Sequence, residues 1–474
     1  MAVRDLRLCS GCLEKMRQID RLKRERIRLK AQVRRLKARL GQQDRHIHER
    51  PFGSSTSSAK EPFKAGATPE NQARKGGAKP GHTGHGRSAT ARLPALPEVQ
   101  RLSPGCSCPC CGGALEQPSE RVRRTIAWEL SKPGVRTTVH EDRWCPNCRM
   151  TVRPCTPGVL PDSMLENSAL ATVAGLHYLQ GLTLGHLARI TGINKSTLVA
   201  AMHRLATVLE PSVAAVLNDL RTGAAIFADE TSWRIDGGSG YAWMMRTLDT
   251  IAYAFRPTRS GTVAQELLGP GPLNGVLETD RYVGYNGLPI LRQFCFAHLL
   301  RELKDLGEDF PDEPEVSAFV RELAPLLAQA MALQGLEPCL PQYQSQARDL
   351  EQRIRKIVGH SARHPGIQSF QAIFRENEDK LYHWVEDPIV RAENNTAERS
   401  LRPTVIARKL SFGSQSLRGA RTREIIMTVL GTLQLRTPDP LAILRHALDT
   451  IALQPERAPE IASILFAEPV PLTG

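Results

Sequence analysis

The length, composition and charge of the chain already exclude several kinds of protein. With 474 residues it is too long for one hydrophobic core, so two to four domains are expected. Hydrophobic residues make up 41% of the chain, as in ordinary globular proteins, but no run of about 18 apolar residues exists to span a membrane. The charged N-terminus lacks the apolar stretch of a secretion signal, so we expect a cytoplasmic protein.

The net charge of +14 lies entirely in the N-terminal part of the chain. Residues 1–100 hold 23 Lys and Arg against 9 Asp and Glu, and the remainder holds 40 of each kind. A basic arm of this kind attracts a polyanion, and nucleic acid is the commonest polyanion in cytoplasm. The charge distribution therefore favours a nucleic-acid-binding protein over a merely solvated basic coil.

Residues 1–50 are predicted to form a coiled coil. The spacing alternates between three and four residues along Ile19, Leu22, Arg26, Leu29, Val33, Leu36 and Leu40. This pattern favours a parallel dimer, and an amphipathic helix packed on its own chain is the alternative. A lone Cys-x-x-Cys pair, Cys9 and Cys12, precedes the seam and needs two further ligands from a dimer to bind zinc.

Residues 51–100 are rich in Gly, Ser, Pro and Ala, lack periodicity and are predicted to be a linker. Within it lies the sequence Lys75-Gly-Gly-Ala-Lys-Pro-Gly-His-Thr-Gly-His-Gly-Arg87. Glycines let a backbone approach phosphates closely, while Lys75, Lys79 and Arg87 neutralise them. We therefore predict that this linker contacts the DNA backbone.

Two Cys-x-x-Cys pairs within residues 101–158 predict a zinc site like that of a zinc ribbon. The four ligands would be Cys108, Cys111, Cys145 and Cys148, which can surround one Zn²⁺ tetrahedrally. The intervening segment has the pattern of a hairpin, with strands at 121–130 and 135–140 around Lys132-Pro-Gly, and this hairpin would bring the pairs together. Cys106 and Cys110 leave the choice of ligands open.

The segment 165–220 is predicted to contain a helix-turn-helix. A helical stretch from Leu182 is followed by Thr191-Gly-Ile-Asn194, and a second helix opens with Lys195, Ser196 and Thr197. This arrangement would place the three polar residues against DNA. Many enzymes contain similar helical hairpins, so the motif alone does not decide the function.

Two apolar strands end on an acid, at Asp229 and at Asp280. Between them the sequence predicts two more strands, at 241–248 and 251–256, and a short helix. Three strands, a helix and a fourth strand is the order of an RNase H-like α/β core. In that order the first and fourth strands are neighbours, so the two carboxylates would face each other.

Paired carboxylates repel unless cations lie between them, and Mg²⁺ prefers carboxylate oxygen. Two Mg²⁺ or Mn²⁺ ions about 4 Å apart activate a nucleophile and stabilise the leaving oxygen in phosphoryl transfer. A third acid would complete the site. The candidates are Glu398 and Glu393 on one predicted helix, and the residues alone leave the choice open.

Four stretches resemble, in this order, the insertion-sequence 66 family of transposases. They are Ala228-Asp-Glu-Thr231, Thr279-Asp-Arg-Tyr-Val-Gly-Tyr285, Cys295-Phe-Ala-His298-Leu-Leu-Arg301 and Asn394-Asn-Thr-Ala-Glu-Arg-Ser-Leu-Arg-Pro403. The linker, the cysteine pairs and the leading coil are similar too, so the resemblance extends from about Leu22 to Leu448. Arg281 stands where the family usually has Gly, and Glu393 where it usually has Asp.

The resemblance implies a zinc-finger-like DNA-binding domain at 101–158 and an RNase H-like catalytic domain whose acids are Asp229, Asp280 and Glu398. We place this domain at 221–307 and 389–436, a helical insertion at 308–388 and a C-terminal helical segment at 437–474. His298 is a further catalytic candidate, with packing on its helix as the alternative. Basic residues after Glu398 would hold phosphates beside the scissile bond, and for Arg402 an ion pair with neighbouring acids is the alternative; they include Arg402, Arg408 and Lys409.

The predicted activity is that of a DDE transposase, which hydrolyses DNA at element ends and joins the freed 3′-hydroxyls to target DNA. The expected partners are terminal inverted repeats, target DNA, further copies of the chain in a dimer or higher oligomer, and accessory transposition proteins. Two alternatives remain at this point: a DNA-binding regulator with an inactive core, and an RNase H-like nuclease that cuts without joining. A structural coiled-coil protein fits the first 50 residues alone.

Overall fold

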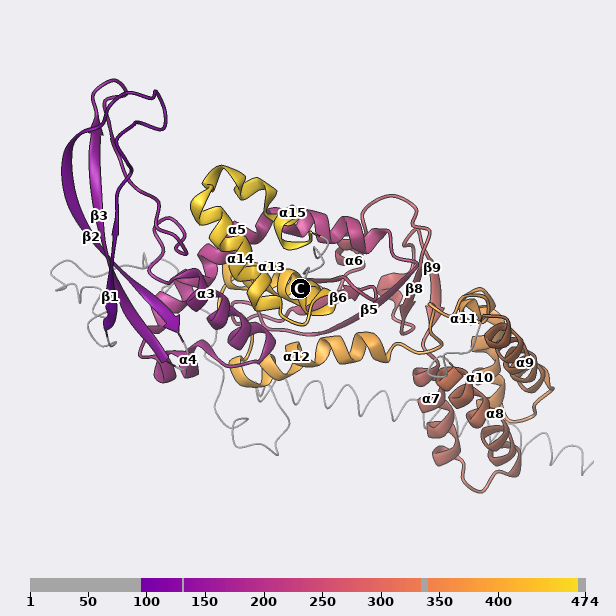
Figure 1. Ribbon diagram of the computed structural model, residues 1–474. Helices are drawn as coiled ribbons and strands as arrows, with labels where there is room; N and C mark the ends of the chain where they lie inside the picture. The colour runs from indigo at the N-terminus through magenta and orange to yellow at the C-terminus, as the bar shows by residue number, and fades with distance from the viewer. Residues whose placement is uncertain (1–94, 130–131, 334–339, 468–474) are drawn as a thin grey trace, which may run out of the picture. The chain divides into compact units, whose positions relative to one another are not determined.

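The computed structural model describes residues 95–129, 132–333 and 340–467 (Figure 1). The predicted coil with Cys9 and Cys12, and the predicted phosphate contacts Lys75, Lys79 and Arg87, lie outside these residues. The described residues form two compact units. The first unit contains residues 278–281 and 292–394, and the second contains the others. None of the helices in these ranges is long and apolar enough to cross a membrane.

The second unit begins with a small sheet, which we call the first sheet. Its strands are β1 (Ala95–Leu102), β2 (Glu116–Glu129), β3 (Lys132–Cys145) and β4 (Met150–Val152). β2 and β3 form a long antiparallel hairpin in which Val122 lies opposite Val139, β1 pairs with β3 in parallel, and β4 pairs with β3. The predicted hairpin is confirmed and its strands are longer than expected. β1 occupies the end of the expected linker.

The second sheet has the strand order β7-β6-β5-β8-β9. Its strands are β5 (Ala225–Ser232), β6 (Tyr241–Arg246), β7 (Ile251–Arg256), β8 (Val276–Thr279) and β9 (Leu291–Phe294), with the short helix α6 (Thr262–Leu268) before β8. The mixed α/β class and the order of three strands, helix and fourth strand are confirmed. β5 and β8 are neighbours, as predicted, and the Val276 N–H donates to the carbonyl of Ala224. β9 was not anticipated.

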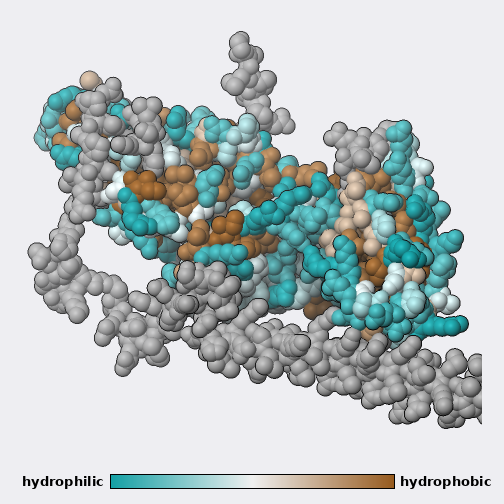
Figure 2. Space-filling view, turned by 90° about the horizontal axis from the view of Figure 1, so that it is seen from below, coloured by the Kyte–Doolittle hydropathy of each residue, from teal (hydrophilic) through white to brown (hydrophobic). Residues whose placement is uncertain are grey.

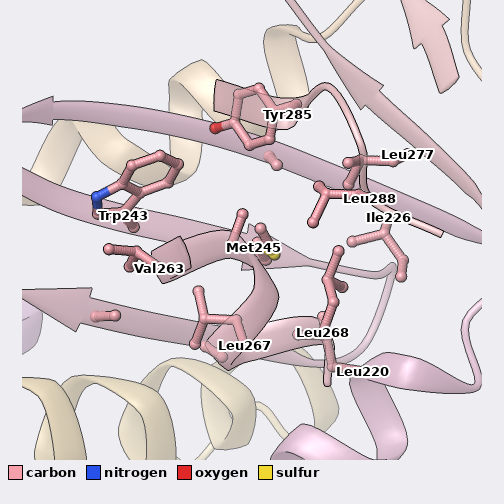
Figure 3. Close-up of a cluster of buried hydrophobic side chains, with 14 of the residues drawn as sticks. Leu220, Ile226, Trp243, Met245, Val263, Leu267, Leu268, Leu277, Tyr285 and Leu288 are labelled. Carbon is pink, nitrogen blue, oxygen red and sulfur yellow. The ribbon is translucent and has the colours of Figure 1, made fainter. Parts of the chain in front are cut away.

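The face of the second sheet that carries Ile226 and Ala228 packs on a cluster of apolar side chains (Figure 3). Trp243 and Met245 of β6 join it, together with Leu220 from the end of α5 (Lys195–Arg221). Alternate residues of a strand point to opposite faces. Because Ala225 and Phe227 are buried as well, both faces of β5 are covered, which explains its continuous apolar start.

Helix α12 (Asn395–Ser411) packs against β5 and β6 on the opposite face of the sheet. Ser400 of α12 accepts hydrogen bonds from two strands, β6 and β7. Arg246 Nη1 of β6 donates to Ser400 Oγ at 3.0 Å, and the Tyr253 hydroxyl of β7 donates to the Ser400 carbonyl at 3.1 Å. By alternation from Phe227, whose register partner is Arg246, this is also the face of Asp229.

Strand β7 is an edge strand, and helix α13 (Leu417–Arg436) covers its open edge. The N–H groups of Ile251 and Tyr253 donate to the hydroxyls of Thr432 and Thr428 at 3.2 and 3.0 Å. The Phe255 N–H donates to Glu424 Oε2 at 3.1 Å. Because acceptors recur every four residues along α13, one face of this helix takes the place of a sixth strand.

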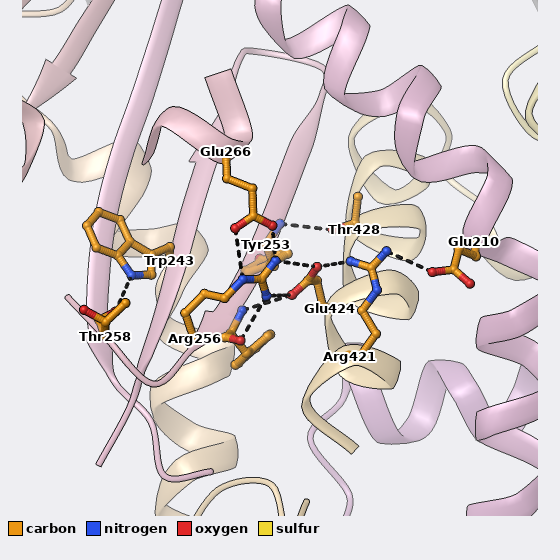
Figure 4. A network of polar contacts seen from close by, with 10 residues as sticks. Glu210, Trp243, Tyr253, Arg256, Thr258, Glu266, Arg421, Glu424 and Thr428 are labelled. Atoms are coloured by element: carbon orange, nitrogen blue, oxygen red, sulfur yellow. Dashed lines mark hydrogen bonds and ion pairs between the residues drawn. The ribbon is translucent and has the colours of Figure 1, made fainter. Parts of the chain in front are cut away.

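Glu424 is also the centre of a polar network on this side of the sheet (Figure 4). Its buried carboxylate pairs with Arg256 of β7 and with Arg421 one turn earlier. Arg256 reaches Glu266 of α6 as well, and Arg421 reaches Glu210 of α5. A buried charge is expensive unless it is paired and hydrogen-bonded, and here both conditions are met.

The remaining helices of the second unit precede β5 or follow β9, except for one 3-10 helix between β8 and β9. They are α3 (Asn167–Ala174), the π-helix η3 (Gly175–Leu179), α4 (Leu184–Thr191), the 3-10 helix η4 (Val283–Tyr285), α14 (Pro440–Leu453), η7 (Pro455–Glu460) and α15 (Ile461–Leu465). Gly192 ends α4 with φ 73°, a conformation that favours glycine. α4 and α5 are the two predicted helices, but α5 continues through Pro211 to Arg221.

The first unit is mostly helical. It contains α7 (Phe296–Asp309), α8 (Pro314–Ala332), α9 (Leu340–Gly359), α10 (Pro365–Glu376), η6 (Glu378–Lys380) and α11 (His383–Glu386). In α9 the buried residues are Tyr343, Ala347, Leu350, Ile354 and Val358, which form one stripe of the helix. Accordingly, hydrophilic residues cover much of these helices on the face at the right of Figure 2.

Candidate functional site

The structure brings together the four cysteines that the spacing predicts. The sulfur atoms of Cys108, Cys111, Cys145 and Cys148 all lie within 4.8 Å of one another. Cys145 ends β3, and the β2–β3 hairpin returns the chain to the first pair. Cys106 and Cys110 are exposed and do not belong to the group, so the geometry favours the four cysteines of the two Cys-x-x-Cys pairs as ligands.

The spacing of the sulfurs fits a tetrahedral metal ion. Cys108 Sγ and Cys148 Sγ are 3.9 Å apart, and Cys111 Sγ and Cys145 Sγ are 3.7 Å apart. A tetrahedron with Zn–S bonds of about 2.3 Å has sulfurs about 3.8 Å apart. The backbone N–H of Cys111 is the main cause that lowers the pKa of Cys108 to about 7. The group can therefore hold a metal ion, and its all-sulfur ligand set suits zinc.

Asp229 lies inside β5, three residues before its end, and not at the end of the strand as the sequence predicted. It is half-buried, and its Oδ1 accepts the N–H of Glu230 at 2.8 Å. The next residue, Glu230, points to the opposite face of the strand. Two adjacent acids thus face two different environments.

The carboxylate of Glu230 is taken up by two neighbours. Arg259 donates to Glu230 Oε1 from Nε at 2.9 Å and from Nη2, and the Tyr285 hydroxyl donates to Oε2. The Glu230 side chain is only 2% exposed. The Arg259 guanidinium also lies 3.9 Å from the ring centre of Tyr282. The buried carboxylate of Glu230 is therefore held by contacts within the fold.

This arrangement was not predicted from the sequence, although Tyr282 and Tyr285 belong to the stretch from Thr279 to Tyr285 that carries the family resemblance. The signal was the pair of tyrosines directly after a candidate acid, because a phenol hydroxyl near a buried carboxylate usually donates to it. Arg259 lies in a loop before α6 and carried no local signal.

The two candidates for the third acid differ in burial. Glu398 is exposed in the first turn of α12, the helix that packs on the sheet face of Asp229. Glu393 belongs to the first unit and is 8% exposed. An exposed carboxylate can reach a metal ion or DNA without rearrangement of the chain, so the burial favours Glu398.

Asp280 directly follows β8 and is half-buried. In the same unit, Glu278 is fully buried, and its Oε1 accepts the N–H of Arg391 at 2.8 Å. Burial raises the pKa of Glu278 well above its usual range. Glu278 is thus suited to be a neutral acid within the fold.

Cys295 and His298 of the quoted Cys-x-x-His motif lie at the start of α7. Cys295 is buried, its sulfur accepts the N–H of Asn394 at 3.1 Å, and burial raises its pKa to about 11. It is therefore a packed thiol and not a nucleophile at neutral pH. His298 is half-buried on the first turn of the helix, where a direct role remains a prediction.

Most of the predicted DNA contacts are accessible to solvent, and one of them is instead bonded within the fold. Lys195 and Ser196 are exposed and Thr197 is half-buried at the start of α5, and Arg402 and Lys409 are exposed on α12. No ion pair holds Arg402 among the residues that the structure describes, which weakens the alternative of a helix salt bridge. Arg408 differs.

Arg408 donates from Nη1 to Thr231 Oγ1 at 3.0 Å and to the Ser232 carbonyl at 2.7 Å. Burial lowers the pKa of Arg408. This side chain ties α12 to β5, so Arg408 has a structural role in addition to the phosphate contact that the sequence predicts.

Comparisons with known proteins agree with these observations. A family model described as "Transposase IS66 family" matches residues 162–422, which is more than half of the chain. The uncharacterized protein y4jD of Sinorhizobium fredii (strain NBRC 101917 / NGR234) is 23% identical over 396 residues, or 73% of this chain and 74% of its own length. The uncharacterized protein y4hP of the same strain is 22% identical over 419 residues, or 78% and 75% of the two chains.

Proposed function

Because the chain belongs to the IS66 family of transposases, we propose that it is a DDE transposase that uses Asp229, Asp280 and Glu398 as metal-binding catalytic acids. It would hydrolyse DNA at the ends of an insertion sequence and join the 3′-hydroxyl ends to target DNA. The matched residues 162–422 include all three acids.

The observation that carries the proposal is the position of α12 in the second unit. This helix bears Glu398 and packs on the sheet face to which Asp229 points, while Glu230 is held on the other face. The strand order supports an RNase H-like core, because the first and fourth strands, β5 and β8, are neighbours. Asp280 directly after β8 is the acid that this order predicts.

The three acids form an oxygen donor set of the kind that Mg²⁺ or Mn²⁺ prefers. Two such ions, when bound, would activate the attacking water or 3′-hydroxyl and stabilise the leaving oxygen. The fold would position these three carboxylates and keep neighbouring acids bonded elsewhere. Glu230, paired with Arg259 and Tyr285, fixes the backbone next to Asp229.

Zinc and DNA have separate sites in this proposal. The four-cysteine group would bind structural Zn²⁺ and hold a DNA-binding finger. Phosphates beside the scissile bond would be held by Arg402 and Lys409, and His298 would assist near the acids. The basic linker would bind element ends through Lys75, Lys79 and Arg87. We also expect cytoplasmic action by a dimer or higher oligomer, with accessory proteins as further partners.

Isosteric substitutions test the catalytic acids in the full-length protein. Asp229→Asn, Asp280→Asn and Glu398→Gln should each reduce Mg²⁺-dependent cleavage of labelled element ends by about 10³-fold or more while end binding persists. Glu393→Gln is the matched control for the third acid and should cleave normally. Retained cleavage in all three variants would refute the assignment. If Glu393→Gln loses cleavage and Glu398→Gln keeps it, Glu393 is the third catalytic acid instead of Glu398.

A second assay separates the transposase from a nuclease. The labelled ends are followed into a supercoiled target plasmid, because strand transfer gives joined products and hydrolysis alone does not. Cleavage without joined products would leave an RNase H-like nuclease. DNA binding without any metal-dependent nicking would leave an inactive regulator.

A further inference from the structure

Helices α5 and α13 pack against each other in the second unit (Figure 1), and a groove runs along the N-terminal half of α5 beside the first turn of α13. The groove has a volume of about 740 Å³. It is lined by Lys195, Ser196, Val199, Ala200, His203, Arg204, Thr207 and Val208 of α5 and by Arg418 of α13. We call it the α5–α13 groove.

The charge of the α5–α13 groove has one sign. Lys195 and Arg418 are exposed, and neither has an ion pair among the described residues. Arg204 donates to the backbone carbonyls of Pro161 and Asp162, and these carbonyls do not neutralise its charge. None of the described residues that line the groove is acidic. The groove therefore presents Lys195 and Arg418 to solvent with no acidic residue in its lining, and Arg204 is held at its edge by backbone carbonyls.

His203 contributes polarity without a fourth charge. Its Nδ1 lies 2.6 Å from Thr422 Oγ1 of α13, so the ring is fixed between the two helices. Burial is the main cause that lowers its pKa, and Arg418 adds to the effect. At neutral pH the ring is uncharged and can donate or accept a hydrogen bond.

The two helices run in the same direction, which adds to the positive potential at the groove. His203 contacts Thr422, and further along the helices Asp219 pairs with Arg436. Their N-terminal ends, which carry partial positive charge, therefore lie on the same side. Lys195 and Arg418 stand in these first turns, where cations are normally disfavoured. A bound anion would remove the repulsion.

We propose that the α5–α13 groove binds the phosphodiester backbone of a DNA strand. The inference rests on the proposed function for the presence of DNA, and it changes the role expected for Lys195 and Ser196. A recognition helix must project into the major groove to reach base edges. Here the start of α5 instead forms one wall of a cavity whose other wall carries Arg418, and such a cavity accepts a strand backbone.

The experiment compares two kinds of duplex, an element end and an unrelated sequence, with the full-length protein. Lys195→Ala and Arg418→Ala should each weaken binding to both duplexes by the same factor. Each should also reduce the slope of log affinity against log salt by about 0.9, because one phosphate contact is lost. Arg445→Ala on α14, an exposed arginine outside the groove, is the control for the change in net charge and should leave the slope unchanged.

Two results would overturn the inference. A loss confined to the element end would mean base recognition, and slopes equal to that of Arg445→Ala would mean no phosphate contact. Thermal melting of each variant identifies any that fails to fold, in which case Arg418→Gln or Lys195→Gln replaces it. If the slopes do not change while Asp229→Asn still abolishes cleavage, the groove inference fails and the proposed function stands.

Discussion

The two sheets are stabilised in different ways. The buried cluster at the cysteine end of the first sheet consists of Cys108, Leu115, Cys145 and Val152, so two of its four residues are cysteines. The second sheet has a large apolar cluster that includes Trp243, and a helix satisfies its edge strand. A cluster of this size buries too little apolar surface to stabilise its end of the sheet by packing alone. We therefore expect the cysteine end of the first sheet to depend on a metal cross-link, and the second sheet to be stable without one.

Removal of the metal gives the largest expected difference between the sheets. Cys145→Ala, or a strong chelator, should unfold the cysteine end of the first sheet, because zinc binding supplies about 10 kcal/mol to small zinc domains. Hydrogen exchange should then lose protection at 106–152 and keep it at 225–256. Cys155→Ala, an exposed cysteine outside the group, is the matched control. Equal protection of 106–152 with and without metal would contradict the comparison.

The adjacent acids of β5 test whether the second sheet also contains essential polar contacts. Glu230→Gln removes the charge that pairs with Arg259 in a buried position and should lower the free energy of unfolding by about 3 kcal/mol. Asp229→Asn, one residue away, should change it by less than about 1 kcal/mol. Urea denaturation measures both variants. If the two losses are equal, Glu230 has no special structural role.

The features that sequence predicted are those that depend on short spacings. Two Cys-x-x-Cys pairs determine their ligand set through local geometry, and the strand at Ile251–Arg256 follows from its apolar residues. The contacts that sequence missed join distant residues. Nothing near Glu230 indicates that Arg259 will pair with it, and Thr428 resembles any helical threonine until β7 lies beside it. The sequence does not predict that α5 extends to Arg221, because a proline such as Pro211 usually ends a helix.

Acid should weaken the second unit through His177 of η3. Burial lowers the pKa of His177 to about 4, and its Nδ1 lies 2.6 Å from the Leu182 carbonyl while Nε2 faces Arg423. The unfolded chain, with a pKa of about 6.5, binds the proton first, so stability falls as the pH drops from about 6.5 to 4. The total loss is about 3 kcal/mol.

His177→Gln keeps a polar side chain and should flatten this part of the pH profile of unfolding. Acid also releases zinc from thiolates, so the measurement must follow the second sheet, through exchange at 225–256, and not total helix content. A variant whose profile parallels that of the unsubstituted protein would exclude His177 as the titrating group.

The smallest expected effect concerns the sealed edge of β7. Thr428→Val keeps the shape of the side chain and leaves the N–H of Tyr253 without its acceptor, at a cost of about 1–2 kcal/mol. Thr172→Val on α3 is the control, because that hydroxyl bonds only within its own helix and its loss should cost about 0.5 kcal/mol or less. Urea denaturation compares the two. Equal losses would mean that α13 covers β7 by packing alone, and a larger loss at Thr428 would show that the second sheet needs hydrogen bonds at its edge as well as an apolar core.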